Sequence, residues 1–142
     1  MENPVDPSRL RIGRLERLQA TMRAQDLEAC LLFNDPNVRY ATGASAMPIW
    51  SNTTFVRCAL VPAEGRPILF DYPNAMHLFR GIEADVRPMH AWEFYDEQAI
   101  EAEIWAGEIV DAMHGKKSLV VRGIPRHDCS RIAAGSDRTR AA

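Results

Sequence analysis

The stretch that decides the fold is Leu27–Gly43, LEACLLFNDPNVRYATG. Its first part, residues 27–33, alternates two sets of side chains, and both sets become apolar in the middle. That pattern is typical of a strand covered on both faces of its sheet. Asn34 or Asp35 can then cap a helix, Pro36 suits the first helical position, and the closing glycine suits the helix end. The stretch therefore predicts a buried strand that runs directly into a short helix.

Helical and strand-like patterns alternate along the rest of the chain. Helices are predicted to begin at Pro7 and to cover 74–80 and 96–114, and strands to cover 53–61, 67–71, 85–90 and 118–121. Residues 44–52 show no period and predict a loop, whereas 62–66 predict a turn that joins two strands in a hairpin. Helices that alternate with strands around one hairpin predict an α/β fold, with three α/β/α layers and a mixed sheet.

Two of these helices carry apolar side chains at helical spacing. The stripes consist of Leu15, Leu18 and Met22 in the first helix, and of Ile100, Ile104, Trp105, Ile109 and Met113 in the last. We expect both stripes to face the sheet. The strand over 85–90 is expected at an edge because Pro88 has no N–H to donate, and the strand over 118–121 is expected to be buried.

Length and composition limit the classes of protein to which this chain can belong. A chain of 142 residues, of which 46% are hydrophobic, is long enough for one domain with its own core. No apolar run approaches the roughly 18 residues of a membrane span, and the start lacks the apolar centre of a secretory signal. Cys30, Cys58 and Cys129 form no CxxC pair, so we expect neither a disulfide framework nor a zinc site. These features predict a cytoplasmic protein without a membrane partner.

Charge is distributed unevenly along the chain. Residues 1–114 carry 10 Lys and Arg against 17 Asp and Glu, a net charge of −7, whereas residues 115–142 carry 7 against 2, a net charge of +5. We therefore expect a domain over 1–121 and a basic, irregular tail over 122–142. The tail is either a solvated terminus or an end produced by a disrupted reading frame. As an alternative function, it could bind an anionic partner, but without interleaved aromatic residues nucleic acid is not the expected one.

Three pieces of the sequence resemble one family. The piece NVRYATG, residues 37–43, resembles the N-x-x-Y-x-[TS]-G element in the amino-terminal domain of the creatinase/prolidase/aminopeptidase P family. The hairpin FVRCALVPAEGRPILFD and the closing helix–strand pair follow in the family's order, so the resemblance covers about residues 10–121. The structural positions of the NVRYATG element are Asn37, Tyr40 and Gly43. Tyr40 is expected to be a packing residue with its hydroxyl bonded locally.

The resemblance implies that this domain is not itself catalytic. In the family, such a domain precedes a larger "pita-bread" domain that holds two divalent metal ions through two aspartates, a histidine and two glutamates. None of those motifs occurs in this sequence, and its four histidines are scattered. We therefore expect no catalytic residue, no metal ligand and no cofactor in this chain. The implied reaction of a full-length relative is Xaa-Pro peptide hydrolysis, creatine hydrolysis or lyase chemistry on a sulfonium substrate.

The resemblance also implies a homodimer. Such domains contribute to dimerisation and can lend residues to the active site of the partner subunit, while the catalytic domain follows in the same chain. Trp50 and Arg57 suit a substrate contact of this kind, because tryptophan can face a cation and arginine can hold a carboxylate. In the alternative interpretation, Trp50 fills the domain's own core and Arg57 lies on a solvated strand face. A small complete α/β enzyme is a further alternative, and it would need a pocket with converging polar groups.

Overall fold

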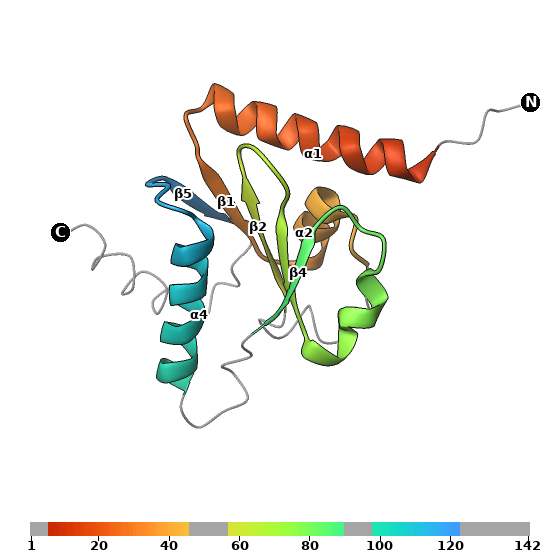
Figure 1. Ribbon diagram of the computed structural model, residues 1–142. Coiled ribbons are helices and arrows are strands. Elements are labelled where there is room, and N and C mark those ends of the chain that lie inside the picture. Colours follow the sequence, from red (N-terminus) through yellow and green to blue (C-terminus); the bar gives the residue numbers. More distant parts are fainter. Residues whose placement is uncertain (1–5, 46–56, 90–97, 123–142) are drawn as a thin grey trace, which may run out of the picture.

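The computed structural model describes residues 6–45, 57–89 and 98–122. Their helices and strands are, in chain order, α1 (Pro7–Ala24), β1 (Ala29–Leu32), α2 (Asp35–Thr42), β2 (Cys58–Pro62), β3 (Ile68–Asp71), the 3-10 helix η1 (Pro73–Phe79), β4 (Asp85–Pro88), α4 (Gln98–Ala112) and β5 (Leu119–Arg122). The strands form one mixed sheet in the order β4-β3-β2-β1-β5 (Figure 1). The predicted α/β fold is confirmed.

Strand β1 lies inside the sheet, as its sequence pattern predicts. It runs parallel to β5 on one side and antiparallel to β2 on the other, with Cys30 paired to Val120 and Val61. All four of its residues are buried. β2 and β3 form the predicted hairpin, and β4, which contains Pro88, runs parallel to β3 at the predicted edge. Because successive side chains of a strand point to opposite faces, β1 supplies the core on both sides of the sheet.

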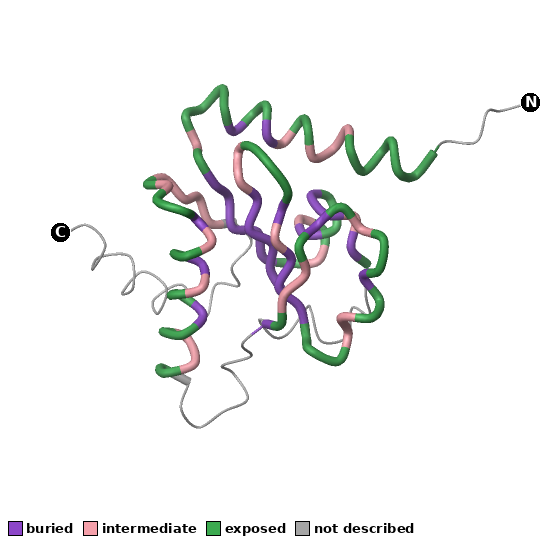
Figure 2. Tube along the Cα trace, viewed as in Figure 1, coloured by how far each residue is buried: buried purple, intermediate pink, exposed green. Residues whose placement is uncertain are grey.

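Helices cover both faces of the sheet. α4 lies against one face, where the rings of Trp105 and Phe33 have centroids 6.0 Å apart. α1, α2 and η1 lie against the other face, so the domain has three layers (Figure 1). Figure 2 shows the buried residues gathered in the central strands, with exposed residues along the outer sides of α1 and α4.

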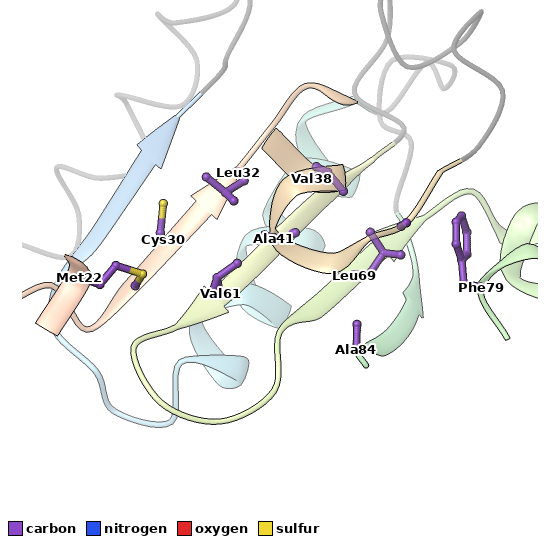
Figure 3. Close-up of a cluster of buried hydrophobic side chains, with 11 residues drawn as sticks. Met22, Cys30, Leu32, Val38, Ala41, Val61, Leu69, Phe79 and Ala84 are labelled. Carbon is purple, nitrogen blue, oxygen red and sulfur yellow. The ribbon is translucent and has the colours of Figure 1, made fainter. Parts of the chain in front are cut away.

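The core beneath α1 and α2 comes largely from the stretch that decides the fold. Cys30 and Leu32 of β1 point to the same side of the sheet as Val38 and Ala41 of α2 (Figure 3). Met22 of α1 packs against the same cluster. Full burial of a Val or Leu side chain contributes about 1.5–3 kcal/mol. These contacts therefore stabilise α2 more than the intrinsic helix propensity of its eight residues, since a helix this short is not stable alone in water.

Helix α2 begins and ends close to where the sequence predicts. Asn34 is the N-cap, and its side-chain oxygen accepts a hydrogen bond from the backbone N–H of Asn37 at 3.1 Å. The helix starts at Asp35, so Pro36 occupies the second position rather than the first. Gly43 closes the helix with a φ of +72°, a left-handed conformation that favours glycine.

Three predicted features differ from the structure. The short helix η1 is a 3-10 helix. β5 is only half-buried, because among the described strands it lies at an edge of the sheet with β1 as its one neighbour. In α4, Trp105 and Ile109 face the core, as does Met113 just after the helix, but Ile100 and Ile104 are 53% and 46% exposed. The reason is geometric, because Ile100 and Ile104 lie on the opposite side of the helix from Ile109.

Several predictions fall outside the described residues. These are most of the loop over 44–52 with Trp50, the first part of the strand over 53–61, the beginning of the helix over 96–114, and nearly all of the tail over 122–142. Among the helices of the described part, none is long and apolar enough to cross a membrane.

Candidate functional site

An arginine lies between two aspartates at one end of the sheet. β2 runs antiparallel to both of its neighbours, so the residue that precedes β2 lies beside the ends of β1 and β3. Arg57 occupies that place. Asp35 follows the end of β1 and opens α2, and Asp71 is the last residue of β3. Three separate segments therefore bring one positive and two negative side chains together.

The guanidinium of Arg57 bonds both aspartates. Its Nε donates to Oδ2 of Asp71 at 2.5 Å, and its Nη1 donates to Oδ1 of Asp35. The side chains of Arg57 and Asp71 are 4% and 3% exposed, so this ion pair is buried. The guanidinium carbon also lies 5.7 Å from the ring centroid of Phe79, within the range of a cation–π contact. We refer to Arg57, Asp35 and Asp71 as the arginine clasp.

Burial and pairing act in opposite directions on Asp71. Burial raises the pKa of its carboxyl because it disfavours the charged form, and this effect outweighs the hydrogen bond and the charge of Arg57, which lower the pKa. The other carboxylate oxygen, Oδ1, accepts the backbone N–H of Tyr72 at 2.7 Å. Both oxygens of Asp71 are therefore bonded within the domain. The arginine clasp joins α2, β2 and β3 to one another, which is a structural task.

The arginine clasp changes the interpretation of Arg57. A solvated strand face, one of the two roles considered for this residue, is wrong because the side chain is buried. The other role, a contact with substrate in a partner subunit, stays a prediction. Trp50, which is predicted to share that contact, lies outside the described residues.

Asp35 and Asp71 are bonding partners of Arg57 that the predicted site does not include. The sequence does carry a signal for them, which is their position. Asp35 and Asp71 each stand at the end of an apolar strand, where a carboxylate is partly or fully withdrawn from water. A buried carboxylate needs a charged or hydrogen-bonding partner, and Arg57 is the arginine that precedes the neighbouring strand.

The three structural positions of the NVRYATG element make three kinds of contact. Asn37 Nδ2 donates to the backbone carbonyl at the end of β1, at 3.3 Å, and so joins helix to strand. Gly43 lies against Arg11 of α1, since a Cβ built on Gly43 would be 2.6 Å from the Cδ of Arg11. Tyr40 is 42% exposed, and its ring centroid lies 5.9 Å from the guanidinium carbon of Arg14. Tyr40 therefore packs against α1 at the surface.

A shallow hollow of about 540 Å³ lies at the opposite end of β1. Its lining consists of Arg23, Asp26, Leu27, Glu28, Ala63 and Ser118. Oε2 of Glu28 accepts the backbone N–H groups of Lys117 at 2.5 Å and Ser118 at 2.8 Å. These two bonds hold the pKa of Glu28 below its ordinary range. Arg23 Nη1 donates to the carbonyl oxygen of Ala63 at 2.7 Å. The hollow is therefore a junction between β1, β2 and β5, where the side chains of Arg23 and Glu28 bond the backbone.

The two metal ions that the family resemblance implies belong to the separate catalytic domain, and the described residues offer no second place for them. Within 6–45, 57–89 and 98–122, no group of three or more His, Cys, Asp or Glu side chains could hold a metal ion. The arginine clasp supplies two carboxylates, but the guanidinium already compensates their charge.

Comparison with known proteins identifies the family of this domain. Residues 14–113 match the model of the creatinase/prolidase N-terminal domain. The chain belongs to this family. The matched range contains the NVRYATG element, all three members of the arginine clasp and nearly all of the described core.

The curated relatives that match are lyases. Dimethylsulfoniopropionate lyase DddP from Roseovarius nubinhibens is 34% identical over 73 residues, which make up 51% of this chain and 16% of the relative. Dimethylsulfoniopropionate lyase DddP from Roseobacter denitrificans is 27% identical over 138 residues, which make up 91% of this chain and 31% of the relative. The chain thus spans less than a third of the length of these two relatives.

Solved structures share the fold. A prolidase from Thermococcus sibiricus superposes with a TM-score of 0.62 at 17% identity, over 94% of this chain and 33% of that protein. The dipeptidase PepE from Mycobacterium ulcerans superposes with a TM-score of 0.59 at 16% identity, over 92% of this chain and 33% of that protein. At such identities the likeness establishes the fold alone.

Proposed function

We propose that this chain is the non-catalytic amino-terminal domain of a metal-dependent enzyme. The observation that carries the proposal is the family match over residues 14–113, combined with relatives of which the chain spans only 16% and 31%. In this proposal the two divalent metal ions and their ligands belong to a catalytic domain that follows in the same polypeptide. We propose the cytoplasm as its compartment, because the thiol of Cys58 is buried and forms no disulfide.

For the complete enzyme, we propose lyase chemistry on a sulfonium substrate. Both curated relatives are dimethylsulfoniopropionate lyases, at 34% and 27% identity, whereas the prolidase and the dipeptidase that share the fold are only 17% and 16% identical. Hydrolysis of Xaa-Pro peptides is the second candidate, and those two solved structures are what favour it.

The role that we propose for the domain is to dimerise and to complete the partner's active site. Trp50 stands seven residues before Arg57 in the sequence, so the arginine clasp fixes one end of the segment that carries it. A sulfonium cation is a suitable ligand for the face of an indole ring. In this proposal Trp50 contacts the substrate, and Arg57 serves that contact by holding the end of the segment in place.

The proposed reaction is tested with the complete enzyme. The purified protein, supplied with Mn²⁺, Co²⁺ or Zn²⁺, is assayed with dimethylsulfoniopropionate and with an Xaa-Pro dipeptide, and its mass is measured by sedimentation. We expect cleavage of the sulfonium compound by a dimer. A higher kcat/KM for the dipeptide would establish the second candidate instead, and a strictly monomeric enzyme would contradict the role in trans.

A further inference from the structure

The helix α4 has apolar side chains on the side that faces away from the sheet. Ile100 and Ile104, one helical turn apart, are 53% and 46% exposed there. Gly107 lies three residues further along the same side, and within the described part of the chain no atom lies within 4 Å of a Cβ built on it. Val110 follows after three more residues and is 59% exposed. The outer side of α4 (Figure 2) therefore has apolar area and room for another segment to approach closely.

The charge of α4 favours a basic occupant. The helix contains four acidic residues and neither lysine nor arginine, a net charge of −4. Glu103 and Asp111 are exposed, and each is four residues from Gly107, so both flank the apolar side chains. A second copy of α4 is an unfavourable partner, because two helices of charge −4 repel each other. A segment that combines arginines with apolar residues suits both properties of this face.

Residues 123–142 of the same chain have this composition. They contain four arginines and two aspartates, a net charge of 4 − 2 = +2, and the run RIAA at 131–134 places apolar residues directly after an arginine. The matched range of dimethylsulfoniopropionate lyase DddP from Roseobacter denitrificans covers 91% of this chain and so leaves out about 13 of its 142 residues. At least about 7 of the 20 residues in 123–142 therefore lie within the match, which supports an inherited segment.

The segment also begins beside α4. Arg122, the last residue of β5, pairs with Leu32 at the end of β1. The next residue of that neighbouring segment is Phe33, whose ring centroid lies 6.0 Å from that of Trp105 in α4. The chain thus leaves the sheet next to the strand end that contacts α4. A helix of 15 residues is about 22 Å long, a length that about seven residues of extended chain can span, so 20 residues are sufficient to cover it.

We propose that residues 123–142 dock on the outer face of α4 in the same molecule. The apolar run 131–134 covers the exposed isoleucines, and the arginines lie beside Glu103 and Asp111. The proposal goes beyond the proposed function, because it concerns the connection to the domain that follows. Since the occupant belongs to the same polypeptide, the contact closes within one molecule and is compatible with a closed dimer. The connection toward the catalytic domain is then fixed along α4.

A double-mutant cycle in the 142-residue chain tests this contact. One variant carries Glu103→Lys and Asp111→Lys, a second carries Arg126→Glu and Arg131→Glu, and a third carries all four substitutions. Urea unfolding gives the equilibrium constant for unfolding of each. Each double reversal is expected to favour unfolding, because like charges then meet. The third variant is expected to be at least about tenfold more stable, in that constant, than the two separate effects together predict.

Reversal on the other face of the sheet is the matched control. Arg9→Glu and Arg17→Glu, at exposed positions of α1, combined with the reversal in α4, should give effects that add within about twofold. Effects that also add for the two reversals in α4 and 123–142 would overturn the docking. The outer face of α4 would then be left to the catalytic domain, and the proposed function would stand, because it does not depend on this contact.

Should a reversed variant lack native circular dichroism, a disulfide equilibrium decides. Gly107→Cys places a thiol on the outer face of α4, and Gly13→Cys places one in α1, each where a new Cβ meets no described atom within 4 Å. The effective concentration of Cys129 at each new thiol is measured against glutathione. We expect it at Gly107→Cys to exceed the millimolar range of a flexible link at least about tenfold, and at Gly13→Cys to stay within or below that range. A millimolar value at Gly107→Cys overturns the docking.

Discussion

Arg57 and Asp71 form a buried ion pair, with Nε and Oδ2 2.5 Å apart, between the residue that precedes β2 and the last residue of β3. The same guanidinium bonds Asp35 at the start of α2. One side chain thus fixes three chain segments at the end of the sheet where the segment carrying Trp50 joins β2. Removal of one partner from a buried pair leaves the other charge uncompensated, which makes the arginine clasp sensitive to mutation.

The first prediction concerns the stability that depends on Arg57. Arg57→Met is expected to lower the free energy of unfolding by about 3–5 kcal/mol, because two carboxylates lose their counter-charge. Arg57→Lys is expected to lower the free energy of unfolding by less, since an ammonium keeps the charge but lacks the forked guanidinium that reaches both aspartates. Urea unfolding at constant pH measures both variants. Arg66→Met, at an exposed turn position, should change the free energy by no more than about 0.5 kcal/mol. Equal stabilities of Arg57→Met and the native chain would show that the clasp is energetically unimportant.

The second prediction concerns pH and Glu28. Backbone N–H groups lower the pKa of Glu28 in the folded domain relative to the unfolded chain. Its contribution to stability is therefore present above about pH 4.3, the ordinary pKa of glutamate, and is lost as the pH falls through the folded value. Glu28→Gln should be less stable than the native chain at neutral pH, and the difference should shrink in acid. Unfolding curves over a pH series measure it, and a pH-independent difference would contradict the assignment.

The third prediction compares two glycines. Gly43→Ala is expected to lower the free energy of unfolding by about 1–2 kcal/mol, because alanine is strained in the left-handed conformation of this position. Arg11 must also move away from the new methyl group. Gly13→Ala provides the contrast, because it lies inside α1 where a Cβ meets no described atom within 4 Å. That substitution should stabilise the domain by about 0.5–1 kcal/mol. Thermal unfolding of the two variants should shift in opposite directions, and a shared direction would count against this account of Gly43.

The fourth prediction separates the two roles considered for Trp50. If Trp50 contacts substrate in the partner subunit, Trp50→Ala raises the KM of the complete enzyme and leaves domain stability close to native. Trp105→Ala is the comparison, because Trp105 is 6% exposed and packs beside Phe33, so its loss should cost about 3–5 kcal/mol. A Trp50 variant that loses similar stability would place Trp50 in the domain's own core.

The local sequence pattern is sufficient to predict those elements whose formation depends on interactions between residues close in sequence. The two-sided apolar run of β1 and the cap, proline and glycine around α2 act within a few residues, so the sequence alone identifies them. Pro88 likewise marks β4 as an edge strand. The alternation of helices and strands then leaves few architectures apart from a mixed sheet between helices.

Other features depend on how segments distant in the sequence pair in the sheet, and the local sequence pattern does not predict them. The arginine clasp joins residues 14 and 22 positions apart in the sequence, and it forms only because β2 runs antiparallel between β1 and β3. The half-burial of β5 follows from its place in the strand order, which its apolar sequence does not encode. The exposed Ile100 and Ile104 have the composition of core residues, yet only one side of α4 can face the sheet.

The central claim is that this chain supplies no catalytic group of its own, and a paired activity assay tests it most directly. The purified 142-residue chain and the complete enzyme are each supplied with Mn²⁺, Co²⁺ or Zn²⁺ and offered dimethylsulfoniopropionate and an Xaa-Pro dipeptide. We predict turnover by the complete enzyme and none above the blank by the 142-residue chain. Metal-dependent turnover that co-purifies with the 142-residue chain and disappears on chelation would contradict the account.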